Sequence, residues 1–160
     1  MPWTRFATVP LLLIPLTACD VVVPTSYRLE FQLIEANGPQ RADPRITEVV
    51  EELRKKLPFD GYSLKDKFSV AVKPDAEFSQ SMGTATDGPR IVYNFKGGFK
   101  TNVNIEGGEE RDTLRLRVER GAEPVLETAV GIRPGQTLVL GSVPRPEEAT
   151  LLIVVRMVEG

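Results

Sequence analysis

Apolar and polar residues alternate with a period of two over most of the chain after residue 26. This period is typical of β-strands that bury one face, because successive side chains point to opposite sides. Residues 27–36 show it most clearly, whereas the continuous apolar run at 151–155 predicts a strand covered on both faces. The other predicted strands lie at residues 68–72, 91–95, 99–105, 114–119, 126–132 and 137–140.

One segment has helical periodicity instead. Apolar residues recur three or four positions apart over residues 46–57. Asp43 suits the N-cap, Pro44 suits the first helical position, and Pro58 ends the pattern. The sequence therefore predicts an amphipathic helix at about 44–57 whose apolar face packs on a sheet.

These patterns predict an α+β fold, predominantly antiparallel β, built as a sandwich or a strongly curved sheet with one helix. The glycine pairs at 97–98 and 107–108 are predicted to form hairpin turns. For residues 91–105 we predict the three-residue loop Lys96-Gly97-Gly98, which pairs Phe95 with Phe99. That register places the large apolar side chains on one face of the hairpin.

Composition narrows the possible chemistry. The chain has 160 residues, 41% hydrophobic and 26% charged, which suits one ordinary domain. Twenty basic and 22 acidic residues give a net charge of -2, so no strong field attracts nucleic acid. There is no histidine and only one cysteine, which excludes an internal disulfide and the nucleophile pairs that depend on histidine.

The first 19 residues have the pattern of a secretory signal. Arg5 precedes an apolar stretch of 11 residues at 6–16, which is too short to span a bilayer. It ends in Leu16-Thr17-Ala18-Cys19, which closely resembles the lipobox of bacterial lipoproteins. The resemblance implies cleavage between Ala18 and Cys19 and attachment of lipid to the Cys19 thiol, with palmitate among the acyl chains.

The lipobox resemblance also implies a place in the cell. We expect residues 1–18 to be a signal peptide, 19–26 a lipidated tether, and 27–160 one β-rich domain without an internal boundary. The protein would be anchored in a membrane of the bacterial cell envelope and face the periplasm or the exterior. Asp20 resembles the signal that keeps enterobacterial lipoproteins in the inner membrane, which favours that membrane.

A second resemblance covers residues 125–156. The stretches Glu127–Val130, Arg133–Gly141 and Leu151–Arg156 look like the end of the bacterial secretin core of type II and type III secretion systems. The chain is far too short for the ring-forming secretin barrel. The resemblance therefore implies a small secretin-like β domain with protein partners in a secretion or pilus assembly.

Several polar groups are candidate sites. Glu30, Asp66 and Glu127 are carboxylates of the kind that a glycosidase pairs, but no sequence signal brings two of them together. The acidic stretch 106–112 lacks the ligand spacing of a calcium loop and predicts an exposed hairpin tip. Arg115 and Arg117 are expected to share a face, with Lys96 or Lys100 joining them in a basic stripe diluted by glutamates.

The sequence thus favours an envelope lipoprotein with a non-enzymatic binding or scaffolding role. We assign no catalytic residue, no metal ligand and no cofactor. Two alternatives stay open. One is a carboxylate-dependent hydrolase or carbohydrate-active domain, and the other is a carrier of a small apolar ligand between the sheet and the helix.

Overall fold

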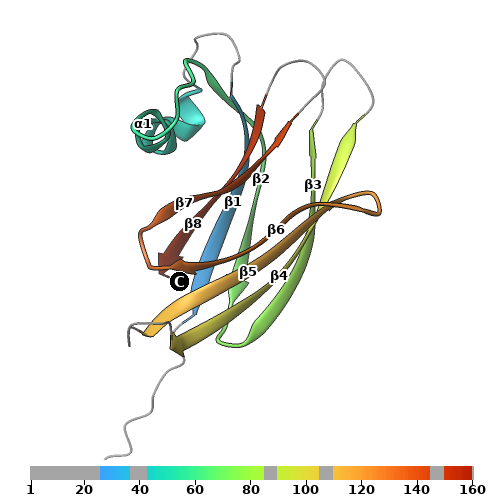
Figure 1. Cartoon of the computed structure of the whole chain (residues 1–160). Coiled ribbons are helices and arrows are strands. Elements are labelled where there is room, and N and C mark those ends of the chain that lie inside the picture. The colour runs from blue at the N-terminus through green and yellow to red at the C-terminus, as the bar shows by residue number, and fades with distance from the viewer. Residues whose placement is uncertain (1–25, 37–42, 85–89, 105–109, 145–149, 160) are drawn as a thin grey trace, which may run out of the picture.

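Two four-stranded antiparallel sheets face each other in this protein (Figure 1). The computed structural model describes residues 26–36, 43–84, 90–104, 110–144 and 150–159. The strands are β1 (Tyr27–Ala36), β2 (Tyr62–Val72), β3 (Ala76–Thr84), β4 (Ile91–Asn104), β5 (Glu110–Arg120), β6 (Glu123–Ile132), β7 (Thr137–Pro144) and β8 (Thr150–Glu159). A 3₁₀ turn η1 (Pro44–Ile46) leads into helix α1 (Thr47–Arg54).

The strand order is β2-β1-β8-β7 in the first sheet and β3-β4-β5-β6 in the second. Strands that follow one another in the sequence are neighbours, and β8 returns to pair with β1. The chain passes from one sheet to the other twice, between β2 and β3 and between β6 and β7, and we call these two places seams. At the second seam Gly135 has φ 78° and Gln136 N donates to Arg133 O at 3.0 Å. The predicted antiparallel β fold with one short helix is confirmed.

The sandwich interior is filled by alternate residues of both sheets. Phe31 of β1 stacks on Phe68 of β2, with ring centroids 4.7 Å apart, and tilts against Phe95 of the opposing sheet at 6.0 Å. The fully buried core side chains from the strands include Leu29, Phe31, Leu33, Phe95, Phe99, Leu114, Val118, Leu151, Ile153 and Val155.

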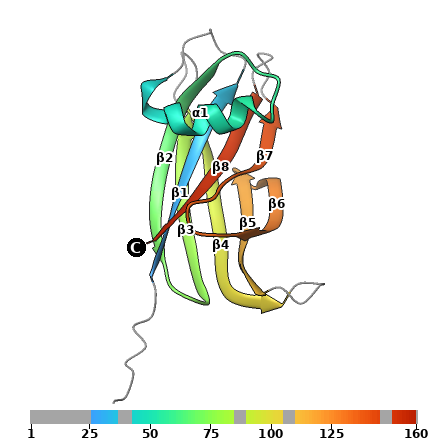
Figure 2. The same cartoon turned by 90° about the vertical axis from the view of Figure 1, so that its left-hand side faces the viewer.

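Helix α1 packs on the outer face of the first sheet (Figure 2). Val49, Val50 and Leu53 form its buried stripe, as predicted, although the α-helix ends at Arg54 and residues 44–46 are 3₁₀. Their partners on the sheet are Ile34, Ala36, Tyr62, Leu64, Leu152 and Val154. Strand β8 is therefore covered on both faces, which confirms the interpretation of its apolar run.

A bulge in β2 allows this strand to contribute side chains both to the sandwich core and to the apolar cluster under α1. Leu33 pairs with Asp66 but Ile34 pairs with Leu64, so Lys65 is the extra residue. On one side of the bulge Leu64 points to α1, and on the other Phe68 points into the sandwich. Both have even numbers, so a regular strand would place them on the same face.

The predicted hairpin within residues 91–105 is wrong. Ile91–Asn104 is one continuous strand, β4, and Phe95 does not pair with Phe99. Gly97 and Gly98 lie in mid-strand between β3 and β5 instead of in a turn. The glycine at 97 serves packing, since the ring of Phe78 on β3 covers it. Residues 107–108, the other predicted turn, lie outside the described residues.

Candidate functional site

The predicted lipid-attachment residues, Ala18 and Cys19, lie outside the described part of the chain. The part of the chain that the structure describes starts at Ser26, directly before β1. Tyr27, the first residue of β1, packs edge-on against Phe99 with ring centroids 5.4 Å apart. Figure 2 places this start of β1 at the end of the sandwich away from α1. The N-terminal segment therefore joins the domain at that end.

The structure does not bring the three candidate carboxylates together. Glu30 lies on the outer face of the first sheet, where Arg28 Nε is 3.5 Å from its carboxylate. Glu127 lies on the outer face of the second sheet, 3.9 Å from Arg117. Asp66 accepts a hydrogen bond from Gly83 N at 2.8 Å and so ties β2 to β3 across their seam. Within the described ranges no group of histidine, cysteine or acidic residues could hold a metal ion.

Arg115 and Arg117 share the outer face of the second sheet, and both Lys96 and Lys100 lie on that face beside them. Glu119 accepts hydrogen bonds there from Lys96 Nζ and from Arg117 Nε, both at 2.9 Å. These bonds, that from Lys96 first, lower the pKa of the Glu119 carboxyl below its usual value. Lys100 and Arg115 form no ion pair with another described residue. Lys96 and Arg117 are therefore paired with a glutamate, whereas Lys100 and Arg115 have no carboxylate partner among the described residues.

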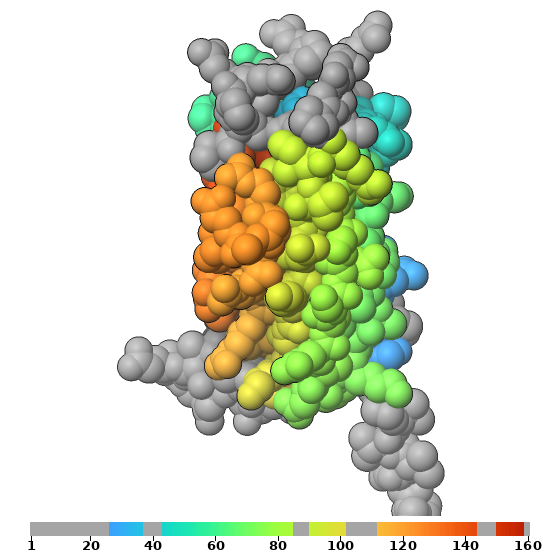
Figure 3. All heavy atoms as spheres, turned by 90° about the vertical axis from the view of Figure 1, so that its right-hand side faces the viewer, coloured from blue at the N-terminus to red at the C-terminus, as the bar shows by residue number. Residues whose placement is uncertain are grey.

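A hollow of about 1120 Å³ lies over these basic residues, on the face seen in Figure 3. We call it the glycine hollow, because Gly97 and Gly98 form part of its lining together with Glu77, Arg115 and Ala129. Gly98 faces outward, and the nearest heavy atom to a side chain there would be Glu77 Cγ at 4.0 Å. The strand backbone is therefore open to approach at this point.

A second depression lies on the first sheet beside the start of α1, with a volume of about 580 Å³. We call it the helix groove; its polar lining includes Gln32, Lys67, Ser69 and Arg156 from the sheet and Thr47 and Glu48 from the helix. Arg156 Nη1 donates to Glu48 Oε2 at 2.8 Å and links β8 to the helix. Two buried atoms in the groove, Gln32 Oε1 and Arg156 Nε, have no hydrogen-bond partner.

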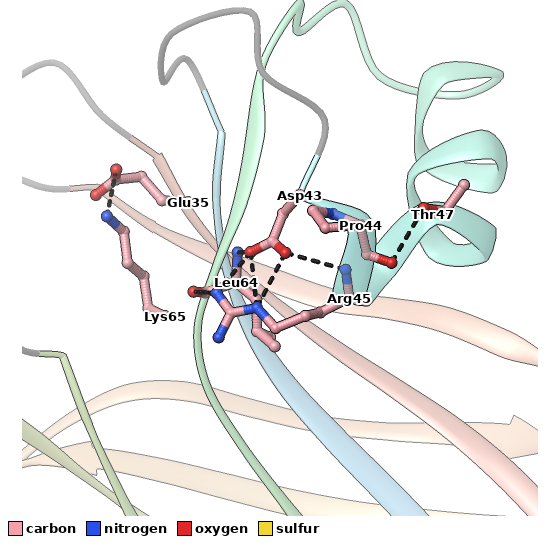
Figure 4. Close-up of polar contacts among 7 residues, drawn as sticks. All are labelled: Glu35, Asp43, Pro44, Arg45, Thr47, Leu64 and Lys65. Atoms are coloured by element: carbon pink, nitrogen blue, oxygen red, sulfur yellow. Dashed lines mark hydrogen bonds and ion pairs between the residues drawn. The ribbon is translucent and has the colours of Figure 1, made fainter.

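A polar cluster holds the helical wall of this groove in place (Figure 4). Asp43 accepts hydrogen bonds from Arg45 N at 3.0 Å, from Arg45 Nη2 at 2.6 Å and from Leu64 N at 3.2 Å. The bonds from the Arg45 side chain, followed by the backbone ones, hold the pKa of Asp43 well below its usual range. Beside it, at the bulge, Lys65 Nζ lies 2.8 Å from Glu35 Oε1. Asp43 thus caps η1, as predicted, and also fixes it to β2.

The sequence does not predict the helix groove. Gln32 stands at an outward position of a predicted strand, which is an ordinary place for a polar residue. Arg156 and Glu48 are 108 residues apart, and no local pattern reports that they meet. The useful signal was a polar residue in a strand whose next outward positions, Ile34 and Ala36, are apolar.

Comparison with protein-family models, with curated proteins and with solved structures gives no match. In the described residues no helix has both the length and the apolar character that crossing a bilayer requires. The structure adds three observations that bear on function, namely the helix groove, the glycine hollow and the end of the sandwich at which the chain enters β1.

Proposed function

We propose that this protein is a lipid-anchored component of the bacterial cell envelope with a non-enzymatic role in binding or scaffolding. The observation that carries the anchor is the lipobox ending at Cys19, the only cysteine of the chain. Because Cys19 lies eight residues before the first strand, an extended tether reaches at most about 27 Å, at roughly 3.4 Å per residue. The domain would stay close to the membrane surface.

The geometry of the sandwich supports such a tethered module. The tether enters through β1, which pairs with β2 on one side and with β8 on the other. It enters at the end away from α1 (Figure 1). The helix groove and the glycine hollow lie on opposite outer faces, so both would be open to partners beside the membrane.

The resemblance to the secretin core supports a narrower proposal, a role as an accessory to a secretion or pilus assembly. The matching stretch, residues 125–156, runs from β6 through β7 to β8 and contributes to both sheets. A partner that recognises this stretch would therefore contact the folded domain. The hydrolase alternative needs two carboxyl groups about 5–9.5 Å apart, and Glu30 and Glu127 on opposite faces do not favour it.

The anchor is tested by metabolic labelling with radioactive palmitate. Wild-type protein should take up the label, whereas Cys19→Ser should accumulate as an uncleaved or misprocessed precursor without it. A double variant that also carries Ser26→Cys keeps one thiol in the wrong place and should stay unlabelled, because the lipobox position is what matters. Equal labelling of the wild type and Cys19→Ser would contradict the anchor.

The binding role is tested by photocrosslinking in intact envelopes. A photoreactive amino acid at Ser69 in the helix groove or at Ala129 in the glycine hollow should capture a defined envelope protein. The control position is Glu123, which is exposed next to the turn between β5 and β6. A partner captured from a face but not from the control supports the role; no capture from either face contradicts it.

A further inference from the structure

The helix groove contains two unsatisfied polar atoms of opposite character. Gln32 Oε1 can only accept a hydrogen bond, and Arg156 Nε can only donate one. Both atoms are buried, and neither has a partner, each other included. Buried polar atoms are rarely left in this condition because desolvation without a hydrogen bond is costly. Once the Gln32 and Arg156 side chains turn toward the groove, a ligand that offers one donor and one acceptor would satisfy both.

The two atoms come from neighbouring strands in the centre of the first sheet. Gln32 of β1 lies opposite Val154 of β8, and Arg156 lies opposite Glu30, two residues away along each strand. They line the same depression. A peptide unit carries an N–H donor and a C=O acceptor on its two sides, which matches this pair of groups.

The shape of the groove favours an extended occupant. Glu48, Val49 and Arg156 also line a second depression, of about 450 Å³, so the two depressions adjoin. That depression lies along α1, and its lining includes Lys56 after the helix and Gln136 and Thr137 at the start of β7. The two depressions together form a trough along the helix, of the kind that a segment of chain fills better than a compact molecule.

The trough is held open before any ligand arrives. Asp43 fixes the start of the helical segment to Leu64 N of β2, and the Arg156–Glu48 pair fixes the first turn of α1 to β8. The buried stripe of the helix, centred on Val50 and Leu53, sets its height above the sheet. Preorganised walls reduce the entropy lost on binding.

Other ligand classes fit less well. Acidic and basic side chains both line the trough, Glu30 and Lys67 at one end and Glu51 and Lys56 at the other. No single sign of charge is therefore presented to an anionic headgroup. The aromatic residues at its margin, Phe31 and Phe68, pack into the sandwich core and offer no ring face to a sugar.

We propose that the helix groove binds an extended polypeptide segment of a partner, with main-chain groups donating to Gln32 Oε1 and accepting from Arg156 Nε. This inference rests on the proposed binding role and names its site and the chemistry of the partner. It does not depend on the lipid anchor.

The test uses the full-length protein in detergent micelles and ¹H–¹⁵N NMR of the Arg156 Nε–H and Gln32 side-chain amide signals. The probe is a blocked, uncharged hexapeptide of alternating alanine and serine. It should shift both signals in a saturable titration. Gln32→Met and Arg156→Lys keep similar volume or charge and should each weaken binding at least about tenfold, the scale of one lost hydrogen bond. Arg115→Lys on the other sheet is the matched control and should bind as the wild type does.

The outcomes separate the two proposals. Absence of a saturable shift, or equal affinity of Arg156→Lys and the wild type, overturns the groove as a peptide site, whatever palmitate labelling and photocrosslinking show. A shift caused by cellohexaose and not by the peptide overturns it in favour of a saccharide. Peptide binding without palmitate uptake keeps the groove and overturns the anchor. The backbone amide spectrum of each variant confirms that it is folded.

Discussion

Gly97 of β4 lies opposite Phe78 of β3, and the Phe78 ring occupies the space that a side chain at position 97 would need. The same ring lies 5.5 Å from the ring of Phe31 in the first sheet, so it belongs to the sandwich core. Gly98, the next residue, points to the outer face and has open space above it. Two adjacent glycines thus have different surroundings.

This contrast gives a matched pair of variants. Gly97→Ala should lower the free energy of unfolding by about 1–3 kcal/mol, because the new methyl group displaces Phe78 from a packed core. Gly98→Ala should leave stability unchanged or raise it slightly, since alanine restricts the unfolded chain. Urea denaturation of both proteins measures the difference. Equal losses would mean that Phe78 does not pack over Gly97.

The bulge at Lys65 gives a second prediction. Deleting Lys65 should abolish cooperative folding, because a regular strand cannot point both Leu64 and Phe68 to their present faces. Lys65→Ala keeps the extra residue and loses only the ion pair with Glu35, so it should fold. Circular dichroism and thermal unfolding compare the two. A deletion variant that unfolds cooperatively near the wild-type temperature would show that the bulge is dispensable.

The packing of α1 is tested by truncating its buried stripe. Leu53 is 2% exposed against Tyr62, Leu64 and Leu152, so Leu53→Ala should cost about 2–5 kcal/mol of stability. Glu52→Ala changes a solvent-exposed neighbour on the same helix and should leave the denaturation midpoint in place. If both variants behave alike, the helix does not contribute to the fold through its apolar face.

The Asp43 cluster predicts a dependence on pH. The folded-state pKa of Asp43 is lowered, chiefly by hydrogen bonds from Arg45, below the value of about 3.9 in an unfolded chain. Its contribution to stability is therefore fully present above about pH 4 and is lost as pH falls toward the folded pKa. Wild type should be more stable than Asp43→Asn at neutral pH, and the gap should narrow below pH 4. Denaturation at several pH values measures it, and a constant gap would contradict the assignment.

The predicted lipid-attachment site and the helix groove differ in how far apart their residues lie in the sequence. The lipobox is a contiguous pattern of a few residues, so the sequence alone suggests it and the anchor it implies. The helix groove needs Gln32, Glu48 and Arg156 to meet, and the pairing of β1 with β8 decides that. Of the candidate carboxylates, Glu30 and Glu127 end on opposite faces because they stand at outward positions of two different sheets that pack face to face.

The sequence by itself determined which side chains are buried in regular strands and in the helix. Alternation predicts the inward face of β1, and the continuous run 151–155 predicts the double cover of β8, because both properties repeat over adjacent residues. Tertiary structure alone decided that residues 97 and 98 continue a strand and that Lys65 is bulged. By local preference a glycine pair favours a turn, so a mid-strand position requires a contact from elsewhere in the fold. The choice depends on Phe78, which stands 19 residues before Gly97 and reaches it only when β3 and β4 pair.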